Sequence, residues 1–531
     1  MKNRKAIVIF LQFILATALA GPAADDWFRD AVFYEVFVRS FSDSNGDGIG
    51  DLNGLTAKLD YLNDGDPATG TDLGVTALWL MPISPSPSYH GYDVTDYDGV
   101  NGDYGTMADF KRLVAEAHKR GMRVILDLVL NHSSSQHPWF LDAASASSPR
   151  RNWYVWKKSL PPGWSQPWSS GSSPEYVWHA LRAGDYFYGL FYDGMPDLNY
   201  GNPAVQEEMI AVAKRWLDAG ADGFRLDAIR YLIESGPGKG QADTPETHAY
   251  LARFYRELKR HKPDCYLVGE IWTDLDTIAS YLGLPRELDS AFNFDLAGAV
   301  VGGVKDRNFG YINATQEVTL ETYPQDAADA LFLTNHDQDR IASVYGPNLD
   351  KLKLAAAVLL TLPGTPYIYY GEEIGMPGTK PDENIRKPML WSDGEHAGFS
   401  TAKPWNAPAR VRPGINVAAE SPDPGSLLSH YRRLIRLRSD HAALRRGGYQ
   451  AVSLANKSVY AYLRSHEQQT LLVLHNFSDQ PQSGLVLPAG LPLAIARDLT
   501  AHAPAAAIAP LAPFATGIYE VTAVPAVDAE K

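Results

Sequence analysis

Acidic and imidazole side chains stand at the ends of four runs that are typical of buried β-strands. These runs are Val124–His132, Gly223–Asp227, Tyr266–Trp272 and Leu331–Asp337. Three of them contribute a carboxylate: Asp227, Glu270 and Asp337. Hydrolysis of a glycosidic bond needs one carboxylate at the anomeric carbon and one carboxylic acid that protonates the leaving oxygen. The three acids therefore indicate a sugar-cleaving site.

Asp227 and Glu270 are the natural reacting pair. Strand alternation places Arg225 and Asp227 on the same side, so the guanidinium is expected to keep Asp227 ionised, as a nucleophile requires. Glu270 is flanked by apolar residues and by Trp272, and such surroundings raise a carboxyl pKa towards the range of a general acid.

Two imidazoles accompany these acids. His336 precedes Asp337, and together they are suited to bind sugar hydroxyls as the ring distorts; His132 supplies another imidazole at the end of the third strand. Any one of the acids alone is explained equally well by a strand-end ion pair or a helix cap. Three acids with neighbouring Arg or His at strand ends favour a catalytic site.

The elements that position these residues alternate between strands and helices from Ala31 to about residue 400. Amphipathic helices such as Met107–Arg120 and Pro203–Ala219 separate the strands. The eight expected strands are Val32–Val38, Val75–Met81, Arg123–Leu130, Gly223–Ala228, Tyr266–Ile271, Ala291–Leu296, Ala330–Thr334 and Tyr367–Tyr370. This pattern predicts a (β/α)8 TIM barrel with its active site at the carboxyl ends of the strands.

Two regions depart from the alternation. The long segment before Pro203 is rich in Trp, Pro, Ser and Gly, which indicates an inserted subdomain after the third strand. After the helix Leu427–Ser439, the strand-like stretches Ser458–Arg464, Thr470–Asn476 and Gly517–Val521 predict a C-terminal antiparallel β-sandwich domain. The expected division is a signal peptide at 1–20, barrel at 21–132 and 201–440, inserted subdomain B at 133–200, and C-terminal β-domain at 441–531.

The N-terminus and the composition bear on location and partners. Lys2, Arg4 and Lys5, the apolar run 6–19 and the small-residue site ending at Ala20 predict a cleaved export signal; a membrane anchor is the alternative. We therefore expect a periplasmic or extracellular protein without a membrane segment. The net charge of −14 argues against nucleic acid, and nothing indicates an obligate protein partner. The single Cys265 excludes an intramolecular disulfide.

A loop after the first strand carries oxygen ligands at alternate positions. Asp43, Asn45, Asp47 and Asp51 match the preference of a hard cation, and we expect Ca²⁺ there. The loop is not an EF-hand, because its twelfth position is Gly54 instead of Glu. An Asx-rich turn without metal is the alternative.

The four runs resemble the four signature regions of the α-amylase family, glycoside hydrolase family 13. They read DLVLNH up to His132, GFRLD up to Asp227, GEIW from Gly269 and TNHD up to Asp337, and the resemblance extends over essentially the whole chain after residue 20. It implies that Asp227 is the nucleophile, Glu270 the general acid/base and Asp337 the transition-state stabiliser.

The resemblance further implies that Arg225, His132 and His336 bind the sugar in the cleavage subsite, and that the anomeric configuration is retained through a covalent glycosyl-enzyme. The Asp43 loop is similar to the calcium loop of many oligosaccharide-cleaving members, and this resemblance implies that the Ile49 carbonyl is a further ligand. Many amylases bind another calcium through an Asn like Asn131 and a His carbonyl; the latter position is Tyr231 here, and this second ion remains open.

Substrate preference follows from the outer loops. His90 and Tyr92 lie in a Tyr-His-Gly-Tyr sequence that resembles endo-acting amylases, whereas exo-acting α-glucosidases commonly carry Asp at the position of Tyr89. Asp382 and Arg386 resemble a pair that binds the next glucose; a surface ion pair is the alternative.

The sequence Met195–Asn199 blends patterns of the oligo-1,6-glucosidase and neopullulanase branches, and so resembles an intermediate subfamily. The expected substrate is an α-glucan or maltooligosaccharide, cut internally at α-1,4 bonds. An α-glucosidase, a cyclomaltodextrinase or neopullulanase, and a transglycosylase remain alternatives. A non-catalytic binding relative is disfavoured, because all three acids are present.

Overall fold

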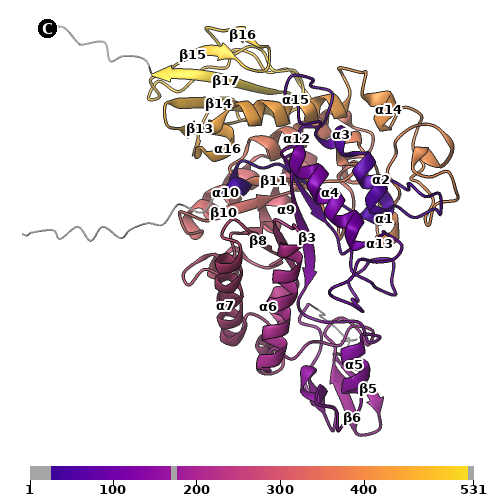
Figure 1. The fold of residues 1–531 in the computed structure, drawn as a ribbon. Helices are drawn as coiled ribbons and strands as arrows, with labels where there is room; N and C mark the ends of the chain where they lie inside the picture. The colour runs from indigo at the N-terminus through magenta and orange to yellow at the C-terminus, as the bar shows by residue number, and fades with distance from the viewer. Residues whose placement is uncertain (1–25, 169–175, 524–531) are drawn as a thin grey trace, which may run out of the picture.

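A closed parallel barrel forms the centre of the molecule. The computed structural model describes residues 26–168 and 176–523, and its barrel strands follow the order β1-β11-β10-β9-β8-β7-β3-β2 (Figure 1). These strands are β1 Phe33–Val36, β2 Ala77–Leu80, β3 Arg123–Val129, β7 Gly223–Asp227, β8 Tyr266–Gly269, β9 Ser290–Phe292, β10 Ala328–Leu331 and β11 Thr365–Tyr369. The predicted eight-stranded barrel is confirmed.

The sixth strand ends earlier than the sequence predicts. We expected Ala291–Leu296, but β9 stops at Phe292 and helix α9 (Phe294–Asp306) starts almost at once. The cause is Asn293, whose side chain accepts a hydrogen bond from the Leu296 backbone N–H at 2.9 Å and so caps the helix. A capping residue here overrides the apolar pattern that favoured a longer strand.

Helices surround the barrel, and local signals set their ends. Thr106 and Asp109 form a capping box at the start of α4, and Asn202 caps α6 with Pro203 at its first position. Both helices fall where the sequence predicts them. The longer helices are α4 Met107–Lys119, α6 Pro203–Asp218, α7 Pro245–His261, α8 Leu275–Leu282, α9 Phe294–Asp306, α10 Gly310–Thr322, α12 Leu349–Thr361 and α15 Leu427–Asp440.

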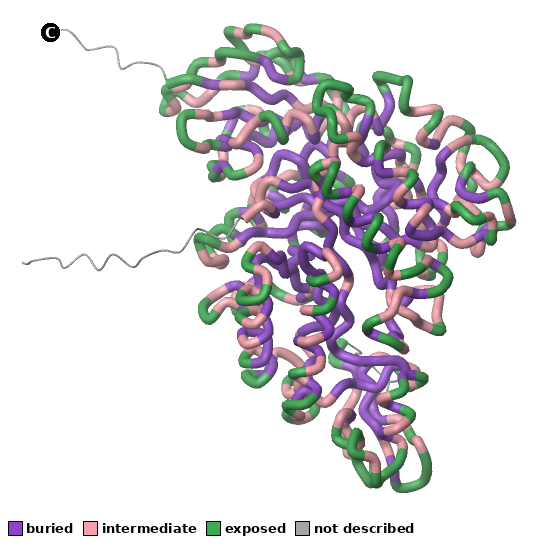
Figure 2. The backbone as a smooth tube through the Cα atoms, in the orientation of Figure 1, coloured by how far each residue is buried: buried purple, intermediate pink, exposed green. Residues whose placement is uncertain are grey.

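Shorter helices occur within the segments that connect these elements. They are α1 Val38–Phe41, α2 Leu52–Ala57, α3 Leu59–Leu62, α5 Pro138–Ala143, α11 Ile341–Tyr345, α13 Asp382–Ile385, α14 Val417–Glu420 and α16 Ala442–Arg446. Burial is concentrated in the barrel strands and the inner faces of the helices around them (Figure 2).

The interior of the barrel is filled by aromatic side chains towards the amino ends of the strands. Phe33, Tyr266 and Tyr367 pack there, and Trp79 and Phe292 lie in the same cluster. Strand alternation separates the two faces: in β7, Phe224 and Leu226 join the outer core, which leaves Arg225 and Asp227 for the inside. The aromatic cluster thus supports the polar residues that follow it along the strands.

The segment between β3 and α6 contains a small sheet of its own. Strands β4 Trp156–Lys157, β5 Trp178–Arg182 and β6 Asp185–Tyr188 pair in the order β4-β6-β5 and lie below the barrel in Figure 1. An isolated bridge joins His132, just after β3, to Asp197, and another within the segment joins Tyr154 to Leu198. The sheet falls within the segment expected as subdomain B, whose limits remain a prediction.

The C-terminal region forms an antiparallel domain, as predicted. Its strands make one six-stranded sheet in the order β12-β13-β14-β17-β15-β16. They are β12 Gly448–Ala451, β13 Val459–His466, β14 Gln469–Asn476, β15 Leu493–Asp498, β16 Ala503–Pro504 and β17 Thr516–Ala523. In the expected sandwich a second sheet would cover the outer face; among the described residues that face is packed by loop side chains such as Leu485 and Leu511.

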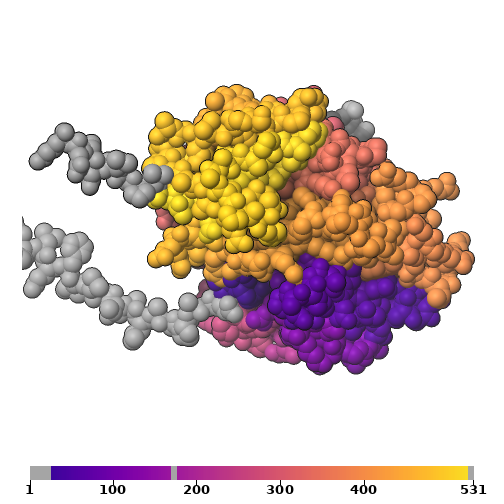
Figure 3. All heavy atoms as spheres, turned by 90° about the horizontal axis from the view of Figure 1, so that it is seen from above, coloured from indigo at the N-terminus to yellow at the C-terminus, as the bar shows by residue number. Residues whose placement is uncertain are grey.

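The sheet is joined to the barrel by buried polar contacts. Arg464 of β13 is fully buried and donates to the carbonyl oxygens of Thr361, at the end of α12, and of Gly447. The Tyr462 hydroxyl lies 2.6 Å from the hydroxyl of the same Thr361. Seen from above, the C-terminal domain (yellow) lies directly against the orange segment (Figure 3).

The remaining expectations concern the termini. The expected signal peptide lies outside the described residues. None of the helices within 26–168 and 176–523 is long and apolar enough to cross a bilayer.

Cys265 is buried, and burial raises the pKa of its thiol to about 12.

Candidate active site

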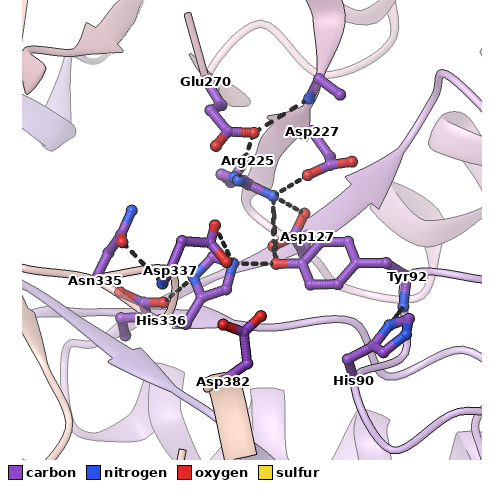
Figure 4. Close-up of polar contacts among 12 residues, drawn as sticks. His90, Tyr92, Asp127, Arg225, Asp227, Glu270, Asn335, His336, Asp337 and Asp382 are labelled. Carbon is purple, nitrogen blue, oxygen red and sulfur yellow. Dashed lines mark hydrogen bonds and ion pairs between the residues drawn. The ribbon is translucent and has the colours of Figure 1, made fainter. Parts of the chain in front are cut away.

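Arg225 is the centre of a network of acids at the carboxyl ends of the strands (Figure 4). Its Nη1 donates to both oxygens of Asp127, at 2.8 and 3.0 Å, and to Oδ1 of Asp227 at 2.7 Å. Its Nη2 lies 2.8 Å from Oε2 of Glu270. The guanidinium is only 1% exposed. One cation therefore holds three carboxylates, and the two predicted reacting acids bind the same guanidinium.

A strained backbone residue also joins Asp227 to Glu270. Ala228, directly after β7, has a φ of 50°, in the left-handed region that disfavours residues with a Cβ. This conformation directs its N–H to Oε2 of Glu270 at 3.3 Å. Strain of this kind concentrates at functional sites, where the surrounding structure enforces it.

Burial governs the protonation of this pair. It raises the pKa of Asp227 to about 7 and that of Glu270 to about 7, although Arg225 opposes both shifts. The expectation that Arg225 keeps Asp227 fully ionised is therefore too simple, because the guanidinium is shared among three acids. Two interacting carboxyls titrate as a pair, and the form of this pair with one proton is the one that acid-base catalysis requires.

Trp272 does not enclose Glu270 as the sequence suggested. Its ring is 51% exposed and stacks on Phe294, with the ring centroids 4.4 Å apart. The raised pKa of Glu270 comes from burial in the barrel mouth.

Asp337 lies on the opposite side of the network from Glu270 (Figure 4). Arg386 donates to its Oδ1 at 2.8 Å and to the His336 carbonyl at 2.9 Å, and the same guanidinium binds Asp382 at 2.9 Å. Burial would raise the pKa of Asp337, but His336, Arg386 and Arg225 outweigh it and lower the pKa to about 2. Asp337 is thus ionised and can accept hydrogen bonds from hydroxyl groups. Asp382 and Arg386 form an ion pair beside it.

Tyr92 links the acids around Arg225 to His336. Its hydroxyl is 3.0 Å from Oδ2 of Asp127 and 2.6 Å from Nε2 of His336, and the Tyr92 and His336 rings stack. His90 accepts from the Tyr92 backbone N–H through Nδ1 at 3.1 Å.

His132 lies apart from the hydrogen-bonded network. It is 1% exposed, and burial lowers its pKa to about 3, so the ring is neutral. Its Nε2 has no hydrogen-bond partner among the residues that the structure describes. A buried nitrogen of this kind is available to a ligand hydroxyl.

Two buried acids of this site were missed as site residues in the sequence. Asp127 of β3 binds Arg225, and Glu35 of β1 binds His336, its Oε1 lying 2.6 Å from Nδ1. Both stand in apolar strands at inward positions, after Ile125 and Phe33 on the same face. An acid on the inward face of a barrel strand is the signal that could have found them.

The Asp43 loop lies apart from this network. Asp43, Asn45 and Asp47 each accept the backbone N–H of the residue two positions later, at 2.8–3.0 Å. The loop packs closely, since a Cβ at Gly48 would meet the Lys403 carbonyl at 2.2 Å. Asp51 has a structural role: its side chain accepts from the Ser44 and Gly54 N–H groups and caps α2 (Leu52–Ala57).

The expected calcium ligands of this loop stay a prediction. Asp43, Asn45, Asp47, Asp51 and the Ile49 carbonyl supply the type of oxygen donor that Ca²⁺ prefers. Within the described residues, no three His, Cys, Asp or Glu side chains cluster closely enough to share a metal ion. At the other expected calcium position, the Asn131 side-chain amide donates to Asp197 at 3.0 Å.

Comparison with known proteins agrees with this geometry. Residues 35–447 match the family model described as the α-amylase catalytic domain, and residues 459–508 match the C-terminal domain of the α-amylase SusG. The chain belongs to the α-amylase family. It is therefore a glycoside hydrolase family member, with the TIM barrel that this family shares.

The individual relatives are named as different enzymes. α-Amylase 3 of Dictyoglomus thermophilum is 42% identical over 90% of each chain, and an oligo-1,6-glucosidase of Halalkalibacterium halodurans is 33% identical over 85% of this chain and 90% of its own. Among solved structures, the α-amylase of H. orenii superposes with a TM-score of 0.77 at 40% identity, covering 93% of this chain and 97% of its own. The trehalulose synthase of Pseudomonas mesoacidophila reaches a TM-score of 0.82 at 33% identity, covering 95% and 100%.

Proposed function

We propose that this protein is a retaining, endo-acting α-amylase that hydrolyses α-1,4 bonds of starch and maltooligosaccharides. The observation that carries the proposal is the shared guanidinium: Arg225 binds both Asp227 and Glu270, and the ionised Asp337 lies on the other side of the network. Two carboxyls acting on one anomeric centre are what double displacement requires.

In this mechanism the pair begins with one proton, on Glu270. Glu270 protonates the glycosidic oxygen while the carboxylate of Asp227 forms a bond to the anomeric carbon, and the aglycone leaves with that proton. Glu270, now ionised, takes a proton from water as the water oxygen attacks the glycosyl-enzyme. Asp227 then leaves as a carboxylate, and the α-configuration is restored.

The remaining residues bind the sugar in the cleavage subsite. The ionised Asp337 accepts hydrogen bonds from hydroxyls that shift as the ring approaches its oxocarbenium-like transition state. Tyr92 lies against the glucose that is cleaved, and His132 and His336 donate or accept at its hydroxyls. Asp382 and Arg386 bind the next glucose.

Endo action is supported by Tyr89. At this position the ring stacks on Trp405, with the centroids 5.3 Å apart, and provides no carboxylate to bind a non-reducing end. The named α-amylases among the relatives, at 42% and 40% identity, point the same way. The oligo-1,6-glucosidase and trehalulose synthase relatives support the second candidate, an exo-acting or transferring enzyme with the same chemistry.

Maltoheptaoside blocked at its non-reducing end separates the two candidates. An endo-enzyme cuts inside the blocked chain and releases shorter blocked products, which chromatography resolves. An exo-enzyme leaves the blocked chain intact yet degrades the unblocked one, and that outcome would exclude the endo proposal. Products longer than the substrate would identify transfer.

We further propose that the Asp43 loop binds Ca²⁺ and that the protein is exported after removal of residues 1–20. The donor set of the loop supports the first proposal. The charged and apolar order of the N-terminal residues supports the second. N-terminal sequencing of the protein recovered outside the cytoplasm tests export, with Gly21 as the expected first residue.

A further inference from the structure

Glu35 is a buried acid that touches none of the predicted reacting carboxyls. It lies in β1, in register with Trp79 and Tyr369 of the neighbouring strands, and its side chain is 2% exposed. Its Oε1 is 2.6 Å from Nδ1 of His336. The proposed mechanism gives Glu35 no role, and a buried acid without a role requires an explanation.

The hydrogen atoms of this network can be assigned from Nε2 of His336. This nitrogen lies 2.6 Å from the Tyr92 hydroxyl and 3.2 Å from Oδ2 of Asp337. Asp337 is ionised and paired with Arg386, so it offers only lone pairs. A bare Nε2 would face those lone pairs, whereas a protonated Nε2 donates to them.

Tyr92 is consistent with this assignment. Its hydroxyl has a single hydrogen, and Oδ2 of Asp127, 3.0 Å away, can accept it. The tyrosine oxygen is then free to accept from Nε2 of His336. The hydrogen on Nε2 therefore satisfies both Tyr92 and Asp337.

Two states remain for Nδ1. Either it is bare and accepts from a protonated Glu35, or it is protonated and His336 is a cation paired with a Glu35 carboxylate. Burial raises the pKa of Glu35 and lowers that of His336, and both effects favour the neutral pair. Around Glu35, Arg225 and Arg340 lower the pKa of the carboxyl, and Asp337 and Asp127 raise it. Around His336, Asp337 raises the pKa of the ring, but burial together with Arg386, Arg225 and Lys380 outweighs it.

We propose that Glu35 is a positioning residue: as a neutral carboxylic acid it donates to Nδ1 of His336 and holds this ring as the Nε2–H tautomer. The ring then directs its single N–H between the Tyr92 hydroxyl and Asp337, the carboxylate that binds the sugar hydroxyl. The contact with sugar rests on the proposed function. The tautomer does not, because it is a property of the free protein.

Nitrogen NMR of the histidine rings in the full-length protein at neutral pH tests the tautomer directly. The chain has 14 His, so the His336 signals are identified by their loss in His336→Gln. We expect one protonated ε-nitrogen and one bare δ-nitrogen. An imidazolium, or a ring protonated at Nδ1 alone, would overturn the proposal without any variant of Glu35.

Two variants show whether Glu35 is the cause. Glu35→Gln keeps an N–H donor of similar size, so the Nε2–H tautomer and the pH profile of kcat should be unchanged. Glu35→Leu removes the donor, and we expect the ring to shift towards Nδ1–H and kcat to fall on the order of 10-fold or more, as when a partner that orients an imidazole is lost. An unchanged His336 spectrum in folded Glu35→Leu would also contradict the proposal.

Glu373→Gln is the matched control. Glu373 is also fully buried, but its Oε1 accepts from the Tyr34 and Tyr61 hydroxyls instead of meeting a histidine. The His336 signals of the Glu373→Gln variant should equal those of the wild type. If the tautomer is as expected and starch is not cleaved, only the proposed function fails; if starch is cleaved and His336 is a cation, only this inference fails.

Discussion

The two ends of the barrel interior are built from the same strands but have opposite character. Towards the amino ends, Phe33 stacks on Tyr367 with centroids 4.4 Å apart, and Tyr266 and Phe28 stack at 4.6 Å. Towards the carboxyl ends, Glu35 and Asp127 follow two positions after Phe33 and Ile125, and β7 presents Arg225 and Asp227. In β1 and β3, a shift of two positions thus changes the role of the side chain from packing to chemistry.

The difference between the ends is also energetic. Aromatic burial at the amino ends stabilises the fold, whereas three acids around one guanidinium at the carboxyl ends are removed from water at a cost that ion pairing only partly offsets. This contrast predicts that substitutions at one end mainly change stability and that substitutions at the other mainly change turnover.

Asp227→Asn should have the largest effect. The amide keeps the shape and the hydrogen bond with Arg225 but cannot attack, so kcat on starch should fall on the order of 10⁴-fold or more, as when a nucleophile is removed. The thermal unfolding midpoint should stay near that of the wild type. Asp276→Asn, at an exposed acid of α8, is the matched control and should retain full activity. Near wild-type starch hydrolysis by Asp227→Asn would refute its assignment as nucleophile.

Glu270→Gln comes next. Loss of a general acid should lower kcat on starch by about 10²- to 10⁴-fold. Glucosides with an activated leaving group need little protonation, so their first step should be largely spared. Rates on both substrates measure this, and an equal loss on both would argue against the role of acid.

Phe33→Ala tests the aromatic end. Removing a fully buried ring should lower the free energy of unfolding by about 3–5 kcal/mol, as in other large-to-small core substitutions, while kcat per folded molecule stays close to wild type. Tyr311→Ala, where the ring is 50% exposed on α10, should change stability by less than about 0.5 kcal/mol. A Phe33 variant that is stable but inactive would break the contrast between the two ends.

The pH profile tests the shared proton. The active form of the pair has Asp227 ionised and Glu270 protonated, and burial raises the pKa of both. As pH rises through about 7, Glu270 loses the proton that it must donate, and kcat/KM falls. At lower pH Asp227 gains a proton, and kcat/KM falls again. The alkaline limb should vanish in Glu270→Gln assayed with an activated substrate. Its persistence there would assign that limb to another group.

Removal of calcium should have the smallest effect. If the folded state alone binds Ca²⁺, EDTA removes a stabilisation of about 2.7 kcal/mol at a calcium concentration of 100 Kd, which scanning calorimetry detects as a lower unfolding midpoint. Asp47→Asn should abolish the sensitivity to EDTA, while Asp66→Asn, in another exposed turn with the same type of hydrogen bond, should preserve it. An unchanged midpoint with EDTA would favour the turn without metal.

The sequence predicted the barrel because its strands repeat a regular pattern, and it predicted Asp227, Glu270 and Asp337 because each follows such a strand. It could not show that Arg225 is shared among three acids, since Asp127 is distant in sequence and comes into contact only when the barrel closes. Glu35 was missed for the same reason: its partner His336 is 301 residues away.

A local hydrogen bond explains one further difference. The apolar pattern around the sixth strand continued past Asn293, whose cap ended the strand. A short side chain met a nearby backbone donor there, a contact that periodicity does not encode.

The contact between Arg464 and Thr361 has a practical consequence for anyone who wishes to divide the chain. A guanidinium from the C-terminal sheet satisfies the carbonyl at the end of α12, the helix that leads into the last barrel strand. A polypeptide cut after residue 440 would leave that carbonyl and the apolar flank beside it without their cover. The natural unit for transplantation or fusion is therefore the barrel together with its sheet, and a shortened barrel should be insoluble.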